Sequence, residues 1–367
     1  MSTFKYYPAL DGFRFLAFFL VFGFHVIAHA EIIGASETLL NSLAFFQLGW
    51  VGVDLFFVLS GFLITTRLLE DAEHRNFFRR FYTKRVLRIF PLYYLVCVFA
   101  FVVLPLVYPD AKKEFPDVFT QWPFFLLHLQ NWWAALGNKG VFLAHFWSLA
   151  IEEQFYLIWP CVFLFLYRKN RLLTFCVAMI VLALALRIGL ILSFESPGKF
   201  IYFATITRLD ALLFGCLLAV LPNEFQRRFS TPRYKTFLYG LVFFSVIYLF
   251  IVWPADIFES TLAMAVVYTV VAMMACALII LLREDSKFTR VFEFKPIVYF
   301  GKISYGLYVY HWPIVLGCRL LVEKTGHQSP TTALVFVFVT FFLTLIVSAI
   351  SYHVFEVRFL RLKNKLV

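Results

Sequence analysis

Long apolar stretches follow one another along almost the whole chain, from Leu10 to Phe355. Each is close to the roughly 20 residues that an α-helix needs to cross the hydrocarbon core of a bilayer. Hydrophobic residues make up 62% of the 367 residues and charged residues only 15%, whereas a globular domain is about half apolar and a quarter charged. A transmembrane β-barrel would show short alternating segments instead. The sequence therefore predicts an all-α polytopic membrane protein.

The pattern predicts about ten transmembrane helices. They lie at residues 10–30, 43–69, 86–108, 146–167, 172–194, 200–221, 237–253, 261–282, 297–318 and 332–355. A further apolar piece, residues 118–136, is interrupted by polar residues and Pro123, and the sequence leaves open whether it crosses the membrane.

Loop charge bears on the topology, because cytoplasmic loops are rich in Lys and Arg. If residues 118–136 do not cross, the basic loops around Arg79, Arg168 and Arg233 share one side with the basic tail, and the acidic loops around Asp110 and Asp256 lie opposite. We therefore expect residues 118–136 to be re-entrant or interfacial, with both termini in the cytoplasm.

Composition narrows the class of protein further. The formal charge of +11 comes from short loops between spans rather than from one folded basic face, so we expect no nucleic-acid partner. The cysteines lie singly in apolar segments, without disulfide or metal-knuckle spacing. No soluble domain or linker separates from the spans, so residues 1–367 are predicted to form a single membrane domain with no appended soluble domain.

Ionisable residues inside spans are costly and mark functional sites by default. By their depth in the predicted spans they form two layers. The inner layer contains Arg14, Arg85 and Arg88. The outer layer contains His25, Asp54, Glu152, Glu153, Arg208, Asp210 and His311. Arg14 and His25 share a helical face about 16 Å apart along the first span. The outer layer therefore predicts a polar chamber built from several helices.

Each group also has a structural interpretation. Arg85 and Arg88 suit phosphate recognition, since planar guanidinium groups match phosphate geometry, but positive-inside anchors have the same composition. Glu152 and Glu153 would also stabilise the N-terminus of a helix that begins near Ser148. The sequence does not decide which of the two faces inward.

Two further alternatives stay open for the outer layer. Asp54, Arg208 and Asp210 could be structural ion pairs between helices. His25 and His29 have a spacing compatible with a metal ion, yet no third ligand is indicated nearby, so no metal is expected.

Several ordered blocks resemble the acyltransferase-3 family of integral membrane acyltransferases, which includes cell-surface O-acetylases. The likeness runs through YPALDGFR (residues 7–14) leading to His25, GVDLFFVLSGF (52–62), RVLRIFP (85–91), FWSLAIEEQFY (146–156), RLDALLFG (208–215), GKISYGLYVYHWP (301–313) and SYHVFE (351–356). Some family members carry an extra soluble domain, so the chain resembles the stand-alone form.

The resemblance implies a multi-pass protein of a bacterial inner membrane. It also implies a donor, acyl-CoA, that is made in the cytoplasm, and by analogy with the family we expect acetyl-CoA. Arg85 and Arg88, with Arg14, would bind its phosphates. His25 would act as a general base on a glycan or lipid-linked sugar hydroxyl, and Glu153 or Glu152 would orient it. Asp54, Arg208, Asp210, His311 and Trp147 would line the substrate chamber.

The sequence leaves other questions of function open. A proton-coupled transporter or flippase of polar envelope precursors would use the same intramembrane charges, although transporters commonly carry internal repeats that this sequence does not show. Direct transfer and a covalent acyl-histidine relay remain alternatives. Neither the acyl group, the acceptor nor the oligomeric state can be predicted.

Overall fold

The computed structural model describes residues 6–108, 118–138, 142–222, 225, 228–229, 231–253, 258, 260–284 and 286–366. Its long helices are α1 Pro8–Ile32, α3 Val51–Asp71, α4 Phe77–Val98, α9 Trp147–Arg168, α10 Leu172–Ser193, α12 Thr205–Val220, α14 Pro232–Val252, α15 Leu262–Leu282, α18 Ser304–Thr325 and α19 Pro330–Ser351. Asp110 and Asp256, which contributed to the topology prediction, lie outside the described residues.

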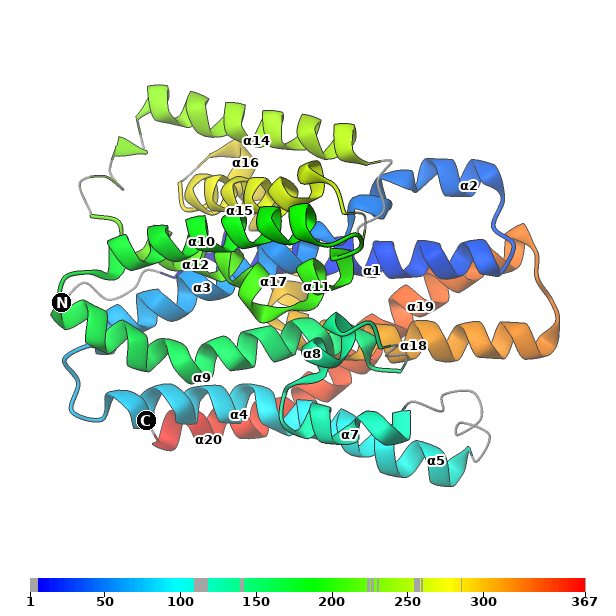
Figure 1. The fold of residues 1–367 in the computed structure, drawn as a ribbon. Coiled ribbons are helices and arrows are strands. Elements are labelled where there is room, and N and C mark those ends of the chain that lie inside the picture. Colours follow the sequence, from blue (N-terminus) through cyan, green and yellow to red (C-terminus); the bar gives the residue numbers. More distant parts are fainter. Residues whose placement is uncertain are drawn as a thin grey trace.

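Short helices connect the long ones. They are α2 Glu37–Ser42, η1 Ala44–Leu48, η2 Phe99–Val103, α5 Leu104–Val107, α7 Val118–Leu126, α8 Gln130–Ala135, η3 Ala144–Phe146, α11 Gly198–Phe203, α16 Lys287–Phe292, α17 Lys295–Lys302, η4 Tyr352–Glu356 and α20 Val357–Leu366. Figure 1 shows α14 at one edge of the bundle and α4 with α20 at the opposite edge.

The fold class is confirmed: the described chain is a polytopic helical bundle. Within the described ranges, nine helical segments are long and apolar enough to cross a membrane. The tenth predicted span, residues 297–318, is divided between α17 and α18. α18 has the length of a span, 22 residues, but it is too polar to count among the nine because it carries His311, Arg319 and Glu323.

Residues 118–136 form two short helices rather than one span. α7 has 9 residues and α8 has 6, so neither reaches across a hydrocarbon core of about 30 Å. The chain turns between them at His128, which has a φ of 53°. The Asn131 amide of α8 donates to the Phe203 carbonyl and the Thr205 hydroxyl at 3.1 and 2.9 Å, and this ties the segment to the break between α11 and α12.

Close contact between helix backbones positions the interior. A Cβ atom at Gly61 of α3 would overlap the Leu212 carbonyl of α12, and one at Gly215 of α12 would overlap the Val58 carbonyl of α3. Small residues at such crossings let membrane helices approach closely. The α3–α12 contact therefore fixes the two helices that carry Asp54 and Arg208.

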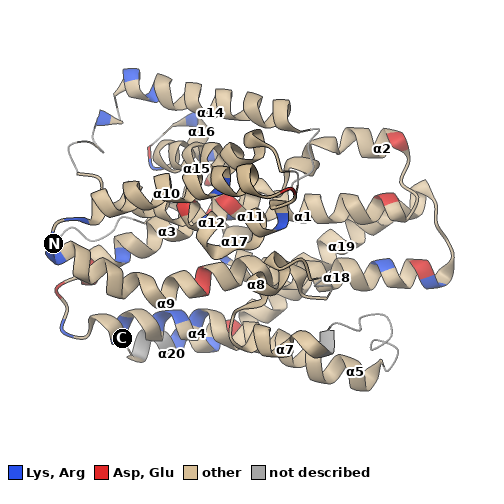
Figure 2. Cartoon of the chain, viewed as in Figure 1, with Lys and Arg blue, Asp and Glu red and all other residues tan. Residues whose placement is uncertain are grey.

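Charge is distributed unevenly between the ends of the bundle. Figure 2 shows Lys and Arg gathered where α4 and α14 begin, whereas acidic residues mark α2 and the end of α1 at the other end. This is the asymmetry on which the topology prediction rests. Cytoplasmic termini stay a prediction.

Candidate active site

Two cavities lie one after the other along the bundle. The first has a volume of about 310 Å³ and the second of about 250 Å³. α1 reaches both, because Arg14 lines the first and His25 the second. α18 does the same through Tyr305 and then Trp312, and α9 also contributes to both. The two cavities are therefore neighbouring chambers along shared helices.

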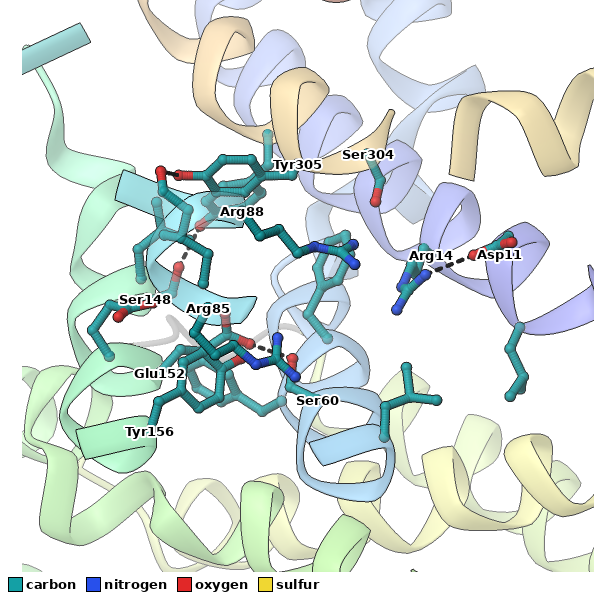
Figure 3. Close-up of a pocket in the computed structure, with 18 of the residues that line it drawn as sticks. Asp11, Arg14, Ser60, Arg85, Arg88, Ser148, Glu152, Tyr156, Ser304 and Tyr305 are labelled. Carbon is teal, nitrogen blue, oxygen red and sulfur yellow. Dashed lines mark hydrogen bonds and ion pairs between the residues drawn. The ribbon is translucent and has the colours of Figure 1, made fainter. Parts of the chain in front are cut away.

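The first cavity contains the arginines that the sequence singled out. Arg85 and Arg88 of α4 both line it, as their spacing of one helical turn predicts. Figure 3 shows these guanidinium groups and that of Arg14 turned toward the same open space. Arg85 also stacks on Tyr156, with the guanidinium carbon 4.9 Å from the ring centre. Within the described chain, neither Arg85 nor Arg88 makes an ion pair with a carboxylate, so their charge is available to an anion.

Arg14 differs from this pair because a carboxylate holds it. Its Nη1 atom lies 2.6 Å from Asp11 Oδ1, and the Tyr6 hydroxyl donates to Asp11 Oδ2 at 2.6 Å. Burial, with the Asp11 carboxylate, raises the pKa of the Tyr6 phenol, so Tyr6 stays a neutral donor. Arg14 is thus an anchored group at the edge of the first cavity rather than an unpaired one.

Glu152 and Glu153 also line the first cavity, with the arginines. The Ser60 hydroxyl of α3 donates to Glu152 Oε1 at 2.7 Å, as Figure 3 shows. The sequence placed both glutamates in the outer layer, one of them orienting His25. The structure instead places them beside Arg85 in the first cavity, at least one helical turn along α9 from Ser148. His25 has a different partner, His311.

A wall of hydrogen-bonded side chains separates the cavities. The Ser148 and Tyr308 hydroxyls lie 2.6 Å apart and both line the first cavity. They lie 3.2 and 2.9 Å from the main-chain carbonyl of His145, whose side chain lines the second cavity. These hydrogen bonds join the start of α9 to α18.

His25 is paired with another histidine. Its Nδ1 atom lies 2.9 Å from His311 Nε2, and the rings are stacked. His311 Nδ1 lies 2.6 Å from the Tyr308 carbonyl, which only accepts, so this nitrogen carries the proton. In neutral His311 the Nε2 atom then accepts from His25 Nδ1. His25 Nε2 is left with a lone pair, which is the form that a general base requires.

The walls of the second cavity are mainly aromatic and amide. Trp133, Trp147 and Trp312 line it together with Gln130. The Trp312 ring centre lies 4.5 Å from that of His25. Lys199 is the one formally charged residue among those that line it in the described chain. The second cavity therefore suits a neutral, hydroxyl-rich ligand better than a polyanion.

The remaining predicted chamber residues form two buried ion pairs. Arg208 Nη2 lies 2.8 Å from both oxygens of Asp54. Asp210 pairs instead with Arg187 of α10, whose Nη2 lies 2.7 Å from its Oδ2. Arg208 stacks against Trp147 at 5.9 Å. Asp54, Arg208 and Asp210 line neither cavity. Of the two interpretations that the sequence left open, structural ion pairs between helices therefore describe them better.

Sequence reasoning missed two residues of this region. Arg187 is ionisable and sits inside the predicted span 172–194, so the rule applied to the other buried charges would have found it. His145 is buried and lines the second cavity, but it precedes the predicted span 146–167 by one residue, so the search of the spans did not reach it. Among the residues the structure describes, no group of three or more His, Cys, Asp or Glu side chains is placed to hold a metal ion.

These features define a helical membrane protein with a cationic chamber and a histidine-containing chamber on shared helices. The acyltransferase domain of the acyltransferase-3 family matches residues 7–353, and the chain belongs to this family. The match covers nearly all the described helices. It confirms the resemblance seen in the sequence blocks and does not favour the transporter alternative.

Curated relatives give further likenesses. The chain is 29% identical over 337 residues to the peptidoglycan O-acetyltransferase OatA of Listeria monocytogenes, covering 88% of this chain and 51% of the relative. It is 29% identical to the O-acetyltransferase OatA of Staphylococcus aureus, over 96% of this chain and 57% of the relative. A putative peptidoglycan O-acetyltransferase of Bacillus subtilis, YrhL, is 27% identical over 96% and 54%.

The chain thus spans about half the length of the curated relatives it matches. No solved structure matches it.

Proposed function

We propose that this chain transfers an acyl group, acetyl by analogy, from cytoplasmic acyl-CoA to a hydroxyl of a cell-envelope glycan. The family match and the names of the relatives support acyl transfer, and those names point to peptidoglycan as the acceptor. The observation that carries the proposal is His25, whose Nε2 lone pair lies in a chamber one wall away from two unpaired arginines.

The first cavity is the proposed donor site. Arg85 and Arg88 would bind the phosphates of acyl-CoA, because their guanidinium groups face the cavity without a carboxylate partner. Arg14 would help to position the phosphates while Asp11 holds its side chain. α4 begins at the end of the bundle that is rich in Lys and Arg, and by the positive-inside rule this supports a donor site that opens toward the cytoplasm.

The thioester would reach His25 through the wall. Arg14 and His25 are separated by about 16 Å along α1, and a pantetheine arm, comparable to about five extended residues, reaches roughly 17 Å. Ser148 and Tyr308 stand on that route, so the arm would have to displace or pass their hydroxyls. The long axis of the donor would then run along the bundle.

In the transfer step, the acceptor hydroxyl oxygen attacks the thioester carbonyl carbon while His25 Nε2 takes its proton. The carbon–sulfur bond breaks, and the CoA sulfur leaves with the proton returned by His25. His311 would accept the His25 Nδ1–H bond throughout, which holds the ring in position and stabilises the transient imidazolium. Atoms and charge balance without a metal or an oxidant.

Reconstitution tests the proposal. The purified protein in liposomes is given radiolabelled acetyl-CoA and soluble peptidoglycan fragments, and label in the glycan is measured. The proposal predicts labelled O-acetyl esters from wild type and none from His25→Ala. Wild type that leaves every glycan unlabelled, while remaining folded, would contradict it.

The same reagents separate direct transfer from an acyl-histidine relay. Protein is incubated with labelled acetyl-CoA alone and quenched rapidly. Label retained on wild type but absent from His25→Ala indicates the relay. Direct transfer leaves the protein unlabelled.

A further inference from the structure

Two residues that line the second cavity each carry a buried hydrogen-bond acceptor without a partner in the described chain. The acceptors are His145 Nδ1 and Gln130 Oε1. His145 is 3% exposed and Gln130 is 5% exposed, and both residues line this cavity with His25. A buried acceptor without a hydrogen bond costs about 1–3 kcal/mol. Two such atoms beside the proposed base therefore call for a ligand that donates to them.

The tautomer of His145 follows from its contacts. Its Nε2 atom lies 3.2 Å from the Val309 carbonyl, which only accepts, so Nε2 carries the proton. In the neutral ring Nδ1 then holds a lone pair. The ring centre is 5.0 Å from that of His311. His145 and His25 both line the second cavity, and both rings contact His311.

The orientation of the Gln130 amide is fixed in the same way. Its Nε2 atom donates to the Phe146 carbonyl at 2.8 Å and to the Tyr93 hydroxyl at 3.2 Å. Because a carbonyl cannot donate, the nitrogen of the amide must face Phe146, and Oε1 is the atom left without a partner.

We propose that His145 Nδ1 and Gln130 Oε1 bind the acceptor, each taking a hydrogen bond from a hydroxyl or amide N–H next to the hydroxyl that His25 deprotonates. This inference rests on the proposed function and deepens it. The substrate class that fits is a sugar that carries several donors on one ring, rather than a simple alcohol. By fixing the neighbouring groups, His145 helps to select which hydroxyl is acylated.

The aromatic walls support a sugar ring as the ligand. Trp133 and Trp312 line the same cavity, and the Trp312 ring lies edge-on to His25. Aromatic rings supply apolar contact area, and a small number of polar groups fix orientation, as is typical of small-molecule sites. A pyranose has apolar C–H faces and a rim of hydroxyls, which matches this combination.

Two substitutions at one position separate this role from a structural one. In His145→Gln the amide nitrogen reaches the Nε2 position and can still donate to the Val309 carbonyl, but the lone pair at Nδ1 is lost. In His145→Asn the amide oxygen lies near the Nδ1 position and keeps an acceptor there, but the bond to Val309 is lost. His327→Gln is the matched control, since His327 is exposed and lines neither cavity.

Binding of N-acetylglucosamine tetramer to the purified full chain is measured by titration without acyl-CoA, so the result does not depend on transfer. His145→Gln is expected to weaken binding about tenfold, the loss of one hydrogen bond. His145→Asn should bind within about threefold of wild type, and His327→Gln as wild type does. In transfer assays, His145→Gln should raise the KM for the sugar more than it lowers kcat.

Each outcome decides the inference. Full binding by His145→Gln together with weakened binding by His145→Asn would mean that His145 only holds Val309, and would overturn it. Wild type that does not bind the sugar would overturn it as well. Sugar binding that depends on His145 without any acyl transfer would instead refute the proposed function and leave the binding site standing.

Discussion

The proposed donor and acceptor cavities differ in the chemical groups that line them. The first presents the guanidinium groups of Arg85 and Arg88 together with the carboxyl group of Glu152, all ionisable groups that line the cavity. The second presents mainly imidazole, amide and aromatic groups, with Lys199 as the one formally charged lining residue in the described chain. The Arg208–Asp54 pair near it is fully buried.

The difference matches two proposed tasks: the first cavity binds the donor, and the second holds the base. Guanidinium groups that line a cavity without a carboxylate partner bind an anion without first breaking another ion pair. A base needs a lone pair held in a defined direction, which the chain of hydrogen bonds from Tyr308 through His311 to His25 provides.

Loss of the His25 ring should remove the base from the second cavity. His25→Ala is expected to lower kcat about 1000-fold, within the range attributed to general base catalysis, without changing the amount of folded protein in the membrane. Transfer of labelled acetyl groups measures the effect, with His327→Ala as the control. Activity within tenfold of wild type would exclude His25 as the base.

Loss of the buried pair behind the aromatic wall should affect folding rather than donor binding. Asp54→Asn leaves Arg208 buried without a counter-charge, which costs about 3 kcal/mol. We expect a clearly lower melting temperature in detergent. Glu70→Gln is the matched control, because Arg67–Glu70 is an exposed pair worth less than about 1 kcal/mol. Equal melting temperatures for the two variants would show that the Asp54–Arg208 ion pair does not stabilise the fold.

His311 is a positioning residue for His25. His311→Phe removes the acceptor for His25 Nδ1 and should lower kcat about 100-fold with little change in the KM for acyl-CoA. In His311→Gln the amide oxygen takes the place of Nε2, and we expect recovery to within about tenfold of wild type. If the two variants are equally impaired, the hydrogen bond is not what His311 contributes.

Arg88 should act on donor binding alone. Arg88→Gln is expected to raise the KM for acyl-CoA about tenfold, as the loss of one charge-assisted hydrogen bond predicts, with a smaller change in kcat. Arg79→Gln, on the exposed face of the same helix, should leave both constants unchanged. A larger effect on kcat than on KM would place Arg88 in the chemical step.

Much of this architecture could be predicted from the sequence. The lengths of the apolar stretches predicted the helical fold, and the spacing of Arg85 and Arg88 predicted that they share a face of α4. These signals are local, since helix periodicity and span length depend only on neighbouring residues.

The partners of buried groups could not be predicted, because they depend on how distant helices cross. His25 was expected beside a glutamate, and it contacts His311, 286 residues away. Arg208 pairs with Asp54, 154 residues away, rather than with its neighbour Asp210. Hydrogen bonds to main-chain carbonyls, such as those of His145 and His311, leave no trace in the side-chain sequence.

The most direct measurement is the structure of the chain with a non-hydrolysable thioether analogue of acetyl-CoA, determined by electron cryo-microscopy. The account predicts phosphates against Arg85 and Arg88, and the thioether sulfur beyond the Ser148–Tyr308 wall, with the acetyl carbonyl next to His25. An analogue bound with its phosphates elsewhere, or with its sulfur confined to the first cavity, would contradict it.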